Sequence, residues 1–179
     1  LKGSNVCDDV SCYIYRDECA RALLENGSAP DALNALGQSP LMVAAQKVGT
    51  KVVIRLLLEA GAQVERVDHK GRSSLYLAVK EGRKENAEVL IQHGCDINLR
   101  CHKTEKTAVH VAVDSLDTAM LNLLIENGAD LNMADCEGDT PLIRLLSTTL
   151  HMSPMIHILL RAQGDVNHHN NKGYTALMT

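Results

Sequence analysis

The chain has 179 residues, of which 45% are hydrophobic and 22% charged, so it can bury one sizeable core or several small cores in series. Its formal net charge of −4 at pH 7 favours neither nucleic acid nor an anionic membrane as an electrostatic partner. Four Tyr, with no Phe and no Trp, leave few aromatic faces on which bases or a cofactor could stack. We therefore expect neither a nucleic-acid partner nor a cofactor.

The sequence contains no membrane or export signal. No apolar run approaches the roughly 20 residues that a membrane-spanning helix needs. The first ten residues, LKGSNVCDDV, lack the apolar centre of a signal peptide. These features predict an intracellular protein of the cytoplasm or nucleus, with no membrane partner.

In chain order, the first predicted helix is DECARALLENG, residues 17–27, whereas VCDDVSCYIY before it does not follow the pattern of the later helices. From residue 39 on, a Ser or Thr that can cap a helix recurs every 33 to 35 residues, twice followed by a Pro suited to the first helical position. These helix starts are SPLM at Ser39, SSLY at Ser73, TAVH at Thr107, TPLI at Thr140 and TALM at Thr175.

A second series marks helix ends at the same period. It comprises LLENG ending at Gly27, LLLEAG at Gly61, VLIQHG at Gly94, LLIENG at Gly128 and LLRAQ at Gln163. Gly readily takes the left-handed conformation that closes a helix. Each period thus predicts two short antiparallel helices, separated by a polar break such as KEGRKEN, residues 80–86. The linker after each pair, for example residues 129–138, has Asp-x-x-Gly turn chemistry and predicts a hairpin-like connection.

The repeated pattern resembles the ankyrin repeat. Its elements are G-A-D-(V/L/I)-N, then D-x-x-G-x-T-P-L-H-x-A-A, then a helix ending L-L-x-x-G, and residues 128–142 reproduce it most closely. The resemblance covers roughly residues 18–179 and implies an all-α solenoid of stacked helix pairs. We divide the chain into an N-terminal capping or degenerate repeat at 1–37, repeats at 38–71, 72–105 and 106–138, an irregular repeat at 139–173, and the start of a further repeat at 174–179.

Several residues depart from the family pattern. The His of T-P-L-H is kept only at His110, and Arg144 stands where the family usually has an apolar residue. Gln163 replaces the helix-ending Gly, and the break TTLHMSP is two residues longer than its equivalents. We therefore expect local irregularity in the fourth repeat.

The sequence lacks the motifs of the common catalytic and metal sites. It contains no GxSxG, HExxH, GxxxxGK(S/T) or GxGxxG, and short-helix solenoids rarely bring distant side chains into a desolvated pocket. The two groups of possible metal ligands, Cys7 with Cys12 and Cys19, and Cys95 with Cys101 and His102, lack paired zinc spacing, and His168-His169 lacks a third ligand. We expect no enzyme activity, no metal, and reduced cysteines in small core or surface positions.

The resemblance implies that a partner protein binds the hairpin tips and the ends of the first helices. By motif position the tips are Ala35, Leu36 and Gln38; His69, Lys70 and Arg72; Lys103, Thr104 and Lys106; Cys136, Glu137 and Asp139; and Asn171, Lys172 and Tyr174. The first-helix ends are Gln46 and Lys47; Lys80 and Glu81; Asp114 and Ser115; and Ser147 and Thr148. These letters change between repeats while the scaffold letters recur, as expected of a surface specific for one partner.

The predicted tips carry a charge pattern. Lys70, Arg72, Arg100, Lys103 and Lys106 predict a basic stripe across the second and third hairpins, and Asp135, Glu137 and Asp139 make the fourth acidic. A partner segment with an acidic stretch would lie along the stripe, and Leu36 and Tyr174 are candidate apolar anchors. Alternatively the tips are simply solvated, because isolated surface charges contribute only about 0 to 1 kcal/mol each.

Asn98, Asn132 and Asn167 occupy the Asn position of the repeat. The resemblance implies that this residue can be hydroxylated by an asparaginyl hydroxylase. The alternative, which we favour, is that its side chain forms hydrogen bonds that stiffen the hairpin.

We therefore expect a monomeric, non-catalytic interaction module, acting as the recognition part of an adaptor, a scaffold or a ubiquitin-ligase substrate receptor, or as a regulator of signalling. An alternative is a regulatory or localising arm of a larger enzyme or channel. A third possibility is a spacer between other domains, in which substitutions at the tips would be silent.

Overall fold

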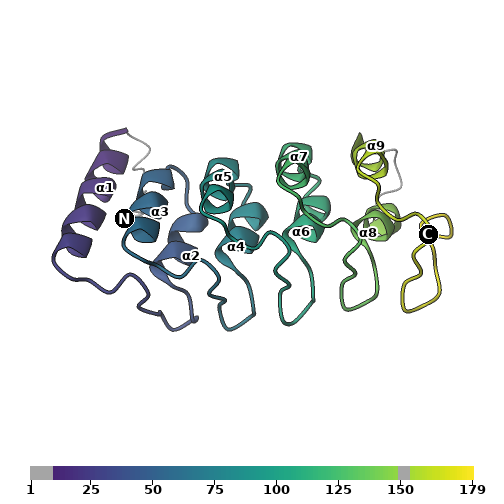
Figure 1. Ribbon diagram of the computed structural model, residues 1–179, viewed down its shortest axis with the longest axis horizontal. Helices are drawn as coiled ribbons and strands as arrows, with labels where there is room; N and C mark the ends of the chain where they lie inside the picture. The colour runs from purple at the N-terminus through teal and green to yellow at the C-terminus, as the bar shows by residue number, and fades with distance from the viewer. Residues whose placement is uncertain (1–9, 149–153) are drawn as a thin grey trace, which may run out of the picture.

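The computed structural model describes residues 10–148 and 154–179, and Figure 1 shows helices stacked in a row, with hairpin loops projecting from one edge. The helices of these ranges are α1 (Val10–Glu25), α2 (Pro40–Ala45), α3 (Lys51–Glu59), α4 (Ser74–Lys80), α5 (Lys84–Gln92), α6 (Ala108–Asp114), α7 (Thr118–Glu126), α8 (Pro141–Thr148) and α9 (Pro154–Arg161). Their only β-type pairing, over the same ranges, is an isolated bridge between Val67 and Ser73. The predicted all-α solenoid is confirmed.

The helices form two rows. The first-helix row contains α2, α4, α6 and α8, and the second-helix row contains α1, α3, α5, α7 and α9. Helices pack within each pair, as α4 does on α5, and along each row, as α4 does on α2 and α6. One hydrophobic core runs between the rows from Leu41 to Leu159. Each repeat therefore covers its neighbour, as the stability of a solenoid requires.

The predicted helix starts at residues 39, 73, 107 and 140 are confirmed. The buried Ser73 hydroxyl, for example, accepts a hydrogen bond from the Tyr76 amide at 3.1 Å, which satisfies a donor in the first turn of α4. The helix predicted to start at Thr175 is wrong, because residues 176–178 form only a turn in which the Met178 amide donates to the Thr175 carbonyl at 3.0 Å. A single turn gains too few hydrogen bonds to offset the cost of nucleating a helix.

The predicted helix ends are also confirmed. Gly61 and Gly128 follow α3 and α7 with φ of +85° and +85°, in the left-handed region. Gln163 takes the same conformation after α9, with φ of +62°, although it has a Cβ. The repeat thus imposes a left-handed residue even where the sequence does not supply Gly.

The N-terminal repeat differs from the others. α1 has 16 residues, whereas α3, α5 and α7 have 9 each. Its second half, which ends at Glu25, corresponds to the predicted helix, and its first half extends back to Val10. In the described ranges no first-row helix precedes α1. The irregularity predicted for TTLHMSP falls largely on residues 149–153, outside the described residues.

Candidate functional site

Four hairpins are built on an Asn or Asp side chain that accepts two backbone amides. Asp68 Oδ1 accepts from the amides of Lys70 at 2.9 Å and Arg72 at 3.0 Å. The same pattern recurs at Asn34, Asp135 and Asn170. These bonds set the turn locally, so the tips of these four hairpins have a defined shape.

The other polar atom of each of these four side chains, Oδ2 of Asp or Nδ2 of Asn, also has a hydrogen-bond partner. The type of partner differs between Asp and Asn. The carboxylates take an Arg: Asp68 Oδ2 accepts from Arg72 Nη2 at 2.5 Å, and Asp135 Oδ2 from Arg144 Nη1 at 3.2 Å. The amides take an acceptor: Asn34 donates to Gln38 Oε1 at 3.4 Å, and Asn170 to Asp139 Oδ1 at 2.8 Å. Burial alone would raise the pKa of Asp68, but hydrogen bonds from the Arg72 side chain and the backbone bring that pKa below its ordinary value.

These contacts correct several of the predicted tip positions. Gln38 and Asp139 are buried, with exposed fractions of 7% and 6%, and Arg72 folds back onto Asp68. Gln38, Arg72 and Asp139 each precede the Ser or Thr that caps the following helix. At this position the side chain bonds to the Asn or Asp of its own hairpin or of the next one. Lys106, at the equivalent position, pairs with Asp114 at 2.7 Å, and Arg100 pairs with Glu105 at 3.0 Å. The predicted stripe is therefore partly neutralised within the chain.

The third hairpin has a different construction. Cys101 stands where the others have Asn or Asp, and five residues separate it from Thr107, against four between Asp68 and Ser73. The extra residue is accommodated by Glu105, which has φ of +52°. The buried Cys101 thiol donates to the Lys70 carbonyl of the preceding hairpin, with Sγ and O 3.2 Å apart. The longer spacing between Cys101 and Thr107 is the sequence signal from which this insertion could have been predicted.

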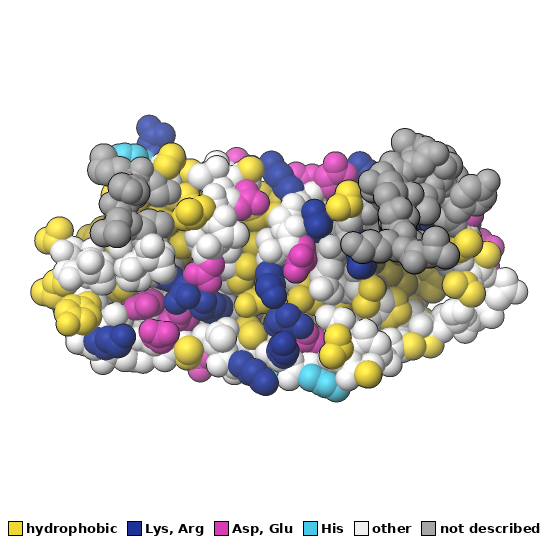
Figure 2. Space-filling model, turned by 180° about the vertical axis from the view of Figure 1, so that it is seen from behind, with side chains coloured by type: hydrophobic (Ala, Val, Ile, Leu, Met, Phe, Trp, Pro, Cys, Tyr) yellow, Lys and Arg dark blue, Asp and Glu magenta, His cyan; other side chains and the backbone are white. Residues whose placement is uncertain are grey.

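The outermost residues of successive hairpins form a row that we call the tip row: Leu36, Lys70, Lys103, Glu137 and Lys172, all exposed. Backbone bonds hold the hairpins side by side, as from the Asn171 amide to the Glu137 carbonyl at 3.1 Å. The packing is close, because a Cβ on Gly71 would lie 2.4 Å from the His102 amide nitrogen. Lys and Arg side chains gather over the middle of the face in Figure 2, toward the hairpin edge.

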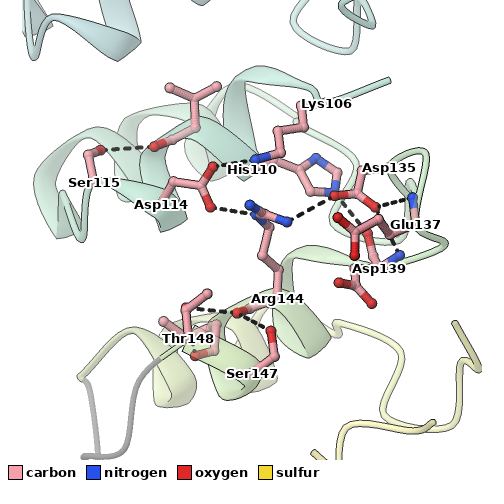
Figure 3. A network of polar contacts seen from close by, with 12 residues as sticks. Lys106, His110, Asp114, Ser115, Asp135, Glu137, Asp139, Arg144, Ser147 and Thr148 are labelled. Atoms are coloured by element: carbon pink, nitrogen blue, oxygen red, sulfur yellow. Dashed lines mark hydrogen bonds and ion pairs between the residues drawn. The ribbon is translucent and has the colours of Figure 1, made fainter. Parts of the chain in front are cut away.

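A polar network joins the third and fourth repeats (Figure 3). Asp114 at the end of α6 accepts from Arg144 Nε at 2.5 Å through one oxygen and from Lys106 Nζ at 2.7 Å through the other. Burial would lower the pKa of Arg144, but its bond and charge interactions with Asp114, followed by the charge of Asp135, raise it. Arg144 departs from the family's apolar residue and here bridges two repeats.

His110 lies under this network and also links two repeats. Its Nδ1 accepts from the Thr107 amide at 3.2 Å, and its Nε2 lies 3.1 Å from the Asp139 carbonyl oxygen. An amide can only donate and a carbonyl can only accept, so the neutral ring protonated on Nε2 satisfies both. Burial lowers the pKa of His110, which favours the same neutral form.

The predicted binding residues therefore fall into two groups. Six are exposed and lie outside every side-chain ion pair of the described residues: Leu36, Lys70, Lys80, Lys103, Glu137 and Tyr174. The others hold the hairpins or repeats together: Gln38, Arg72, Arg100, Lys106, Asp114 and Asp139. Sequence position alone does not separate the groups.

The Asn residues of the repeat form a ladder between neighbouring repeats. Asn98 Oδ1 accepts from the Asp130 amide at 2.8 Å, and Asn132 Oδ1 accepts from the Asp165 amide at 2.7 Å. Glu65, at the equivalent position, accepts from the Asp96 amide at 2.7 Å. This geometry favours the structural role for Asn98 and Asn132. Asn167 is exposed, and its backbone amide donates to Asp165 Oδ1 at 2.8 Å.

The described residues show no grouping of three or more His, Cys, Asp or Glu side chains suited to a metal. Burial, with the charges of Glu65 and Asp96, raises the pKa of Cys95 to about 12, so it remains a thiol. His168 Nε2 lies 3.1 Å from the Gly138 carbonyl oxygen and so faces the hairpin. Across residues 10–148 and 154–179, every helix is too short or too polar to cross a membrane.

Comparison with known families identifies the repeat. The profile described as "Ankyrin repeats (3 copies)" matches residues 10–101, and "Ankyrin repeat" matches residues 104–136. The chain belongs to the ankyrin repeat family. The crystal structure of the ankyrin repeat domain of Bcl-3 superposes with a TM-score of 0.85 and 26% sequence identity, covering 93% of this chain and 74% of that chain.

Relatives of known name share the repeats. The chain is 30% identical over 139 residues to the B-cell lymphoma 3 protein homolog of Mus musculus, and 34% identical over 152 residues to the Neurogenic locus Notch protein of Drosophila melanogaster. It is 34% identical over 110 residues to the Ankyrin repeat and SOCS box protein 6 of Homo sapiens. These matches cover 75%, 76% and 61% of this chain, but 31%, 6% and 26% of the relatives' own lengths.

Proposed function

We propose that this ankyrin chain is a non-catalytic protein-interaction module that binds a partner segment along the tip row, as the recognition part of an adaptor, scaffold or substrate receptor inside the cell. The supporting observation is a contrast within the hairpins. Four of the five hairpins repeat the same internal bonds, whereas the outward side chains of the five hairpins are Leu36, Lys70, Lys103, Glu137 and Lys172. Because the tips contact mainly solvent, their outward side chains can suit a particular partner without a loss of stability.

The tip row favours an extended partner with a definite charge order. Helices of neighbouring repeats pack about 8 to 10 Å apart, and an extended chain advances about 3.3 Å per residue. About three partner residues therefore span one hairpin. An apolar residue over Leu36 would be followed by acidic residues about three and six positions later, over Lys70 and Lys103.

A second candidate function follows from the lengths of the relatives. The chain spans between 6% and 31% of the lengths of the three relatives described above, so it is also proposed as a regulatory or localising arm of a larger protein. The name Ankyrin repeat and SOCS box protein 6 favours the substrate-receptor form of the proposal.

The test compares affinity capture, with quantitative mass spectrometry, for the wild-type chain and a Lys70→Glu/Lys103→Glu variant. Arg72 and Lys106 are left unchanged because they form internal ion pairs. An Arg55→Glu/Arg161→Glu variant carries the same charge change on exposed residues of the second-helix row that lie outside the ion pairs of the described residues, and is the matched control.

A partner that binds the tip row should be depleted about tenfold or more with the tip variant and retained with the control. Equal capture by both variants would refute the tip-row proposal. Hydroxylation of Asn98, Asn132 or Asn167 would appear in peptide spectra of protein purified from cells. Sedimentation of the purified chain tests the predicted monomeric state.

A further inference from the structure

The third hairpin lacks the side-chain oxygen that organises the other four. In the second hairpin that oxygen is Asp68 Oδ1, which accepts from the amides of Lys70 and Arg72. Cys101 occupies the equivalent position of the third hairpin, and its thiol donates to the Lys70 carbonyl instead. The amides of the third hairpin therefore have no acceptor of this kind within their own loop.

Three amides of this hairpin have no acceptor among the residues that the structure describes: those of Lys103, Thr104 and Lys106. Glu105, which lies among them, has φ of +52°, and its amide donates to the Cys101 carbonyl at 2.7 Å. Neighbouring backbone amides around a left-handed residue commonly form a concave site for an anion. The third hairpin therefore offers donors to an external anion where the other four hairpins use an internal oxygen.

The charges around these amides favour an anion between the second and third hairpins. The exposed Lys103 and Lys70 lie outside every ion pair of the described residues. The acid within the third hairpin, Glu105, is paired with Arg100 at 3.0 Å. Glu137, at the tip of the fourth hairpin, disfavours an anion on that side.

The number of donors and charges suits a phosphate monoester. Near neutral pH a phosphorylated Ser or Thr carries a charge of about −1.5 to −2 and three acceptor oxygens, whereas a carboxylate has a single charge and two oxygens. Two ammonium groups and three amides match the phosphate more fully. The chain's four Tyr, with no Phe or Trp, leave few faces for a nucleotide base, so a phosphorylated side chain of a protein is the better fit.

We propose that the third hairpin binds a phosphoserine or phosphothreonine of the partner segment. The proposal rests on the proposed function and specifies one of its two acidic positions, the one over Lys103. The phosphorylated residue lies about six positions after the apolar residue over Leu36, at about three partner residues for each hairpin. Phosphorylation of the partner then controls when the tip row is occupied.

The first test titrates inorganic phosphate into the nitrogen-15-labelled chain at constant ionic strength and follows the amide chemical shifts. The amides of Lys103, Thr104 and Lys106 should shift and saturate. Lys172 is the internal reference, because it is also a tip lysine but its amide already donates to Asn170 Oδ1 at 3.0 Å. Shifts in the third hairpin no larger than the shift of Lys172 would overturn the proposal.

Two substitutions of Cys101 separate the roles of the amides and the thiol. Cys101→Asp supplies an internal carboxylate, as Asp68 does in the second hairpin, and should weaken phosphate binding about tenfold or more. Cys101→Ala removes the same thiol without adding an acceptor and should retain binding. Equal binding by the two variants, each checked for folding by the amide shifts of the other hairpins, would contradict the role of the free amides.

A second pair of variants leaves the buried cysteine in place. Lys70→Gln/Lys103→Gln should weaken phosphate binding about tenfold, because it removes both cations and keeps the amides. Lys172→Gln, on the fifth hairpin, is the matched control and should bind as wild type. Unchanged binding by the double variant would also overturn the proposal.

The source of the phosphate is tested with a synthetic peptide that has Leu and, six positions later, phosphoserine. It should bind about tenfold or more tightly than inorganic phosphate and than the same peptide with Ser or Glu in place of phosphoserine. An affinity no greater than that of inorganic phosphate would assign the site to a free phosphate compound, and an equal affinity of the Glu peptide would assign it to a carboxylate. Either result would overturn the proposal.

The capture experiment separates this proposal from the tip-row proposal. A partner that is depleted with Lys70→Glu/Lys103→Glu should also be lost when the lysate is first treated with a phosphatase. If that partner is captured equally after phosphatase treatment, the phosphate proposal is wrong and the tip-row proposal stands.

Discussion

Asn86 has a structural role that a single substitution can measure. It lies in α5 with 3% of its surface exposed, and its side-chain amide reaches the end of α2 in the preceding repeat. The closest acceptors are the carbonyl oxygens of Lys47 at 2.8 Å and Ala45 at 3.1 Å. Ala45 is the last residue of α2 and Lys47 follows its C-cap, Gln46, so neither carbonyl has a donor within the helix.

Asn86→Ala removes both donors, so two acceptors near the end of α2 lose their bonds. Each buried acceptor left without a donor costs about 1 to 3 kcal/mol. The cost at Lys47 is smaller, because Lys47 is exposed and the Thr50 hydroxyl lies 3.0 Å from its carbonyl oxygen. We therefore expect the free energy of unfolding to fall by about 2 to 4 kcal/mol. Urea unfolding followed by circular dichroism measures the loss. Hydrogen exchange should locate it in the amides of α2 and α5.

Gln92→Ala, an exposed change at the end of the same helix, is the matched control and should lie within about 0.5 kcal/mol of wild type. If Asn86→Ala costs no more than this control, the reasoning that cross-repeat hydrogen bonds cap the first-row helices is refuted.

Three further predictions follow from the same geometry. Gln163→Gly removes the backbone strain of a left-handed residue that has a Cβ, and should raise the free energy of unfolding in urea by about 0.5 to 1 kcal/mol. A lower free energy of unfolding would contradict this. Arg144→Leu should lower the free energy of unfolding by about 1 to 3 kcal/mol, because it leaves Asp135 Oδ2 buried without its cation. In a double-mutant cycle, adding Asp135→Asn should recover most of this loss. If the effects of the two substitutions simply add, the two residues are not coupled. Burial lowers the pKa of His110 in the folded chain, so the unfolded chain binds a proton at His110 more readily. The contribution of His110 to the free energy of unfolding should therefore be fully present above its ordinary pKa of about 6.5 and decrease as the pH falls below that value. His110→Met should flatten this part of the stability profile, and an unchanged slope would assign the pH dependence to other groups.

The hairpins show how far local sequence could predict the candidate site. Their position and turn type follow from Asp-x-x-Gly chemistry, because an Asx side chain and a left-handed Gly act within five residues. The exposure of Leu36 and Lys70 follows from the same local geometry. The burial of Gln38 and Asp139 does not, because each is engaged by the side chain of a hairpin Asn, and the partner of Asp139 is 31 residues away.

Residues that link neighbouring repeats were the hardest to interpret. Asn86 ends the polar run KEGRKEN, which the sequence predicts as the break between the two helices of a repeat. In the structure it lies in α5, and its side chain donates hydrogen bonds to residues about 40 positions earlier. Arg144 was recognised only as a departure from the family pattern. Its partner Asp114 lies 30 residues before it and was assigned to partner binding. In both cases the interaction depends on how two repeats stack.

The sequence by itself determined the repeat period, the first-row helix starts at residues 39, 73, 107 and 140, the helix ends and the solenoid class, because capping, left-handed glycines and helical periodicity act over one or two turns of chain. Only the tertiary structure decided which polar side chains are available to a partner, since an ion pair such as Arg144 with Asp114 forms only when adjacent repeats bring them together.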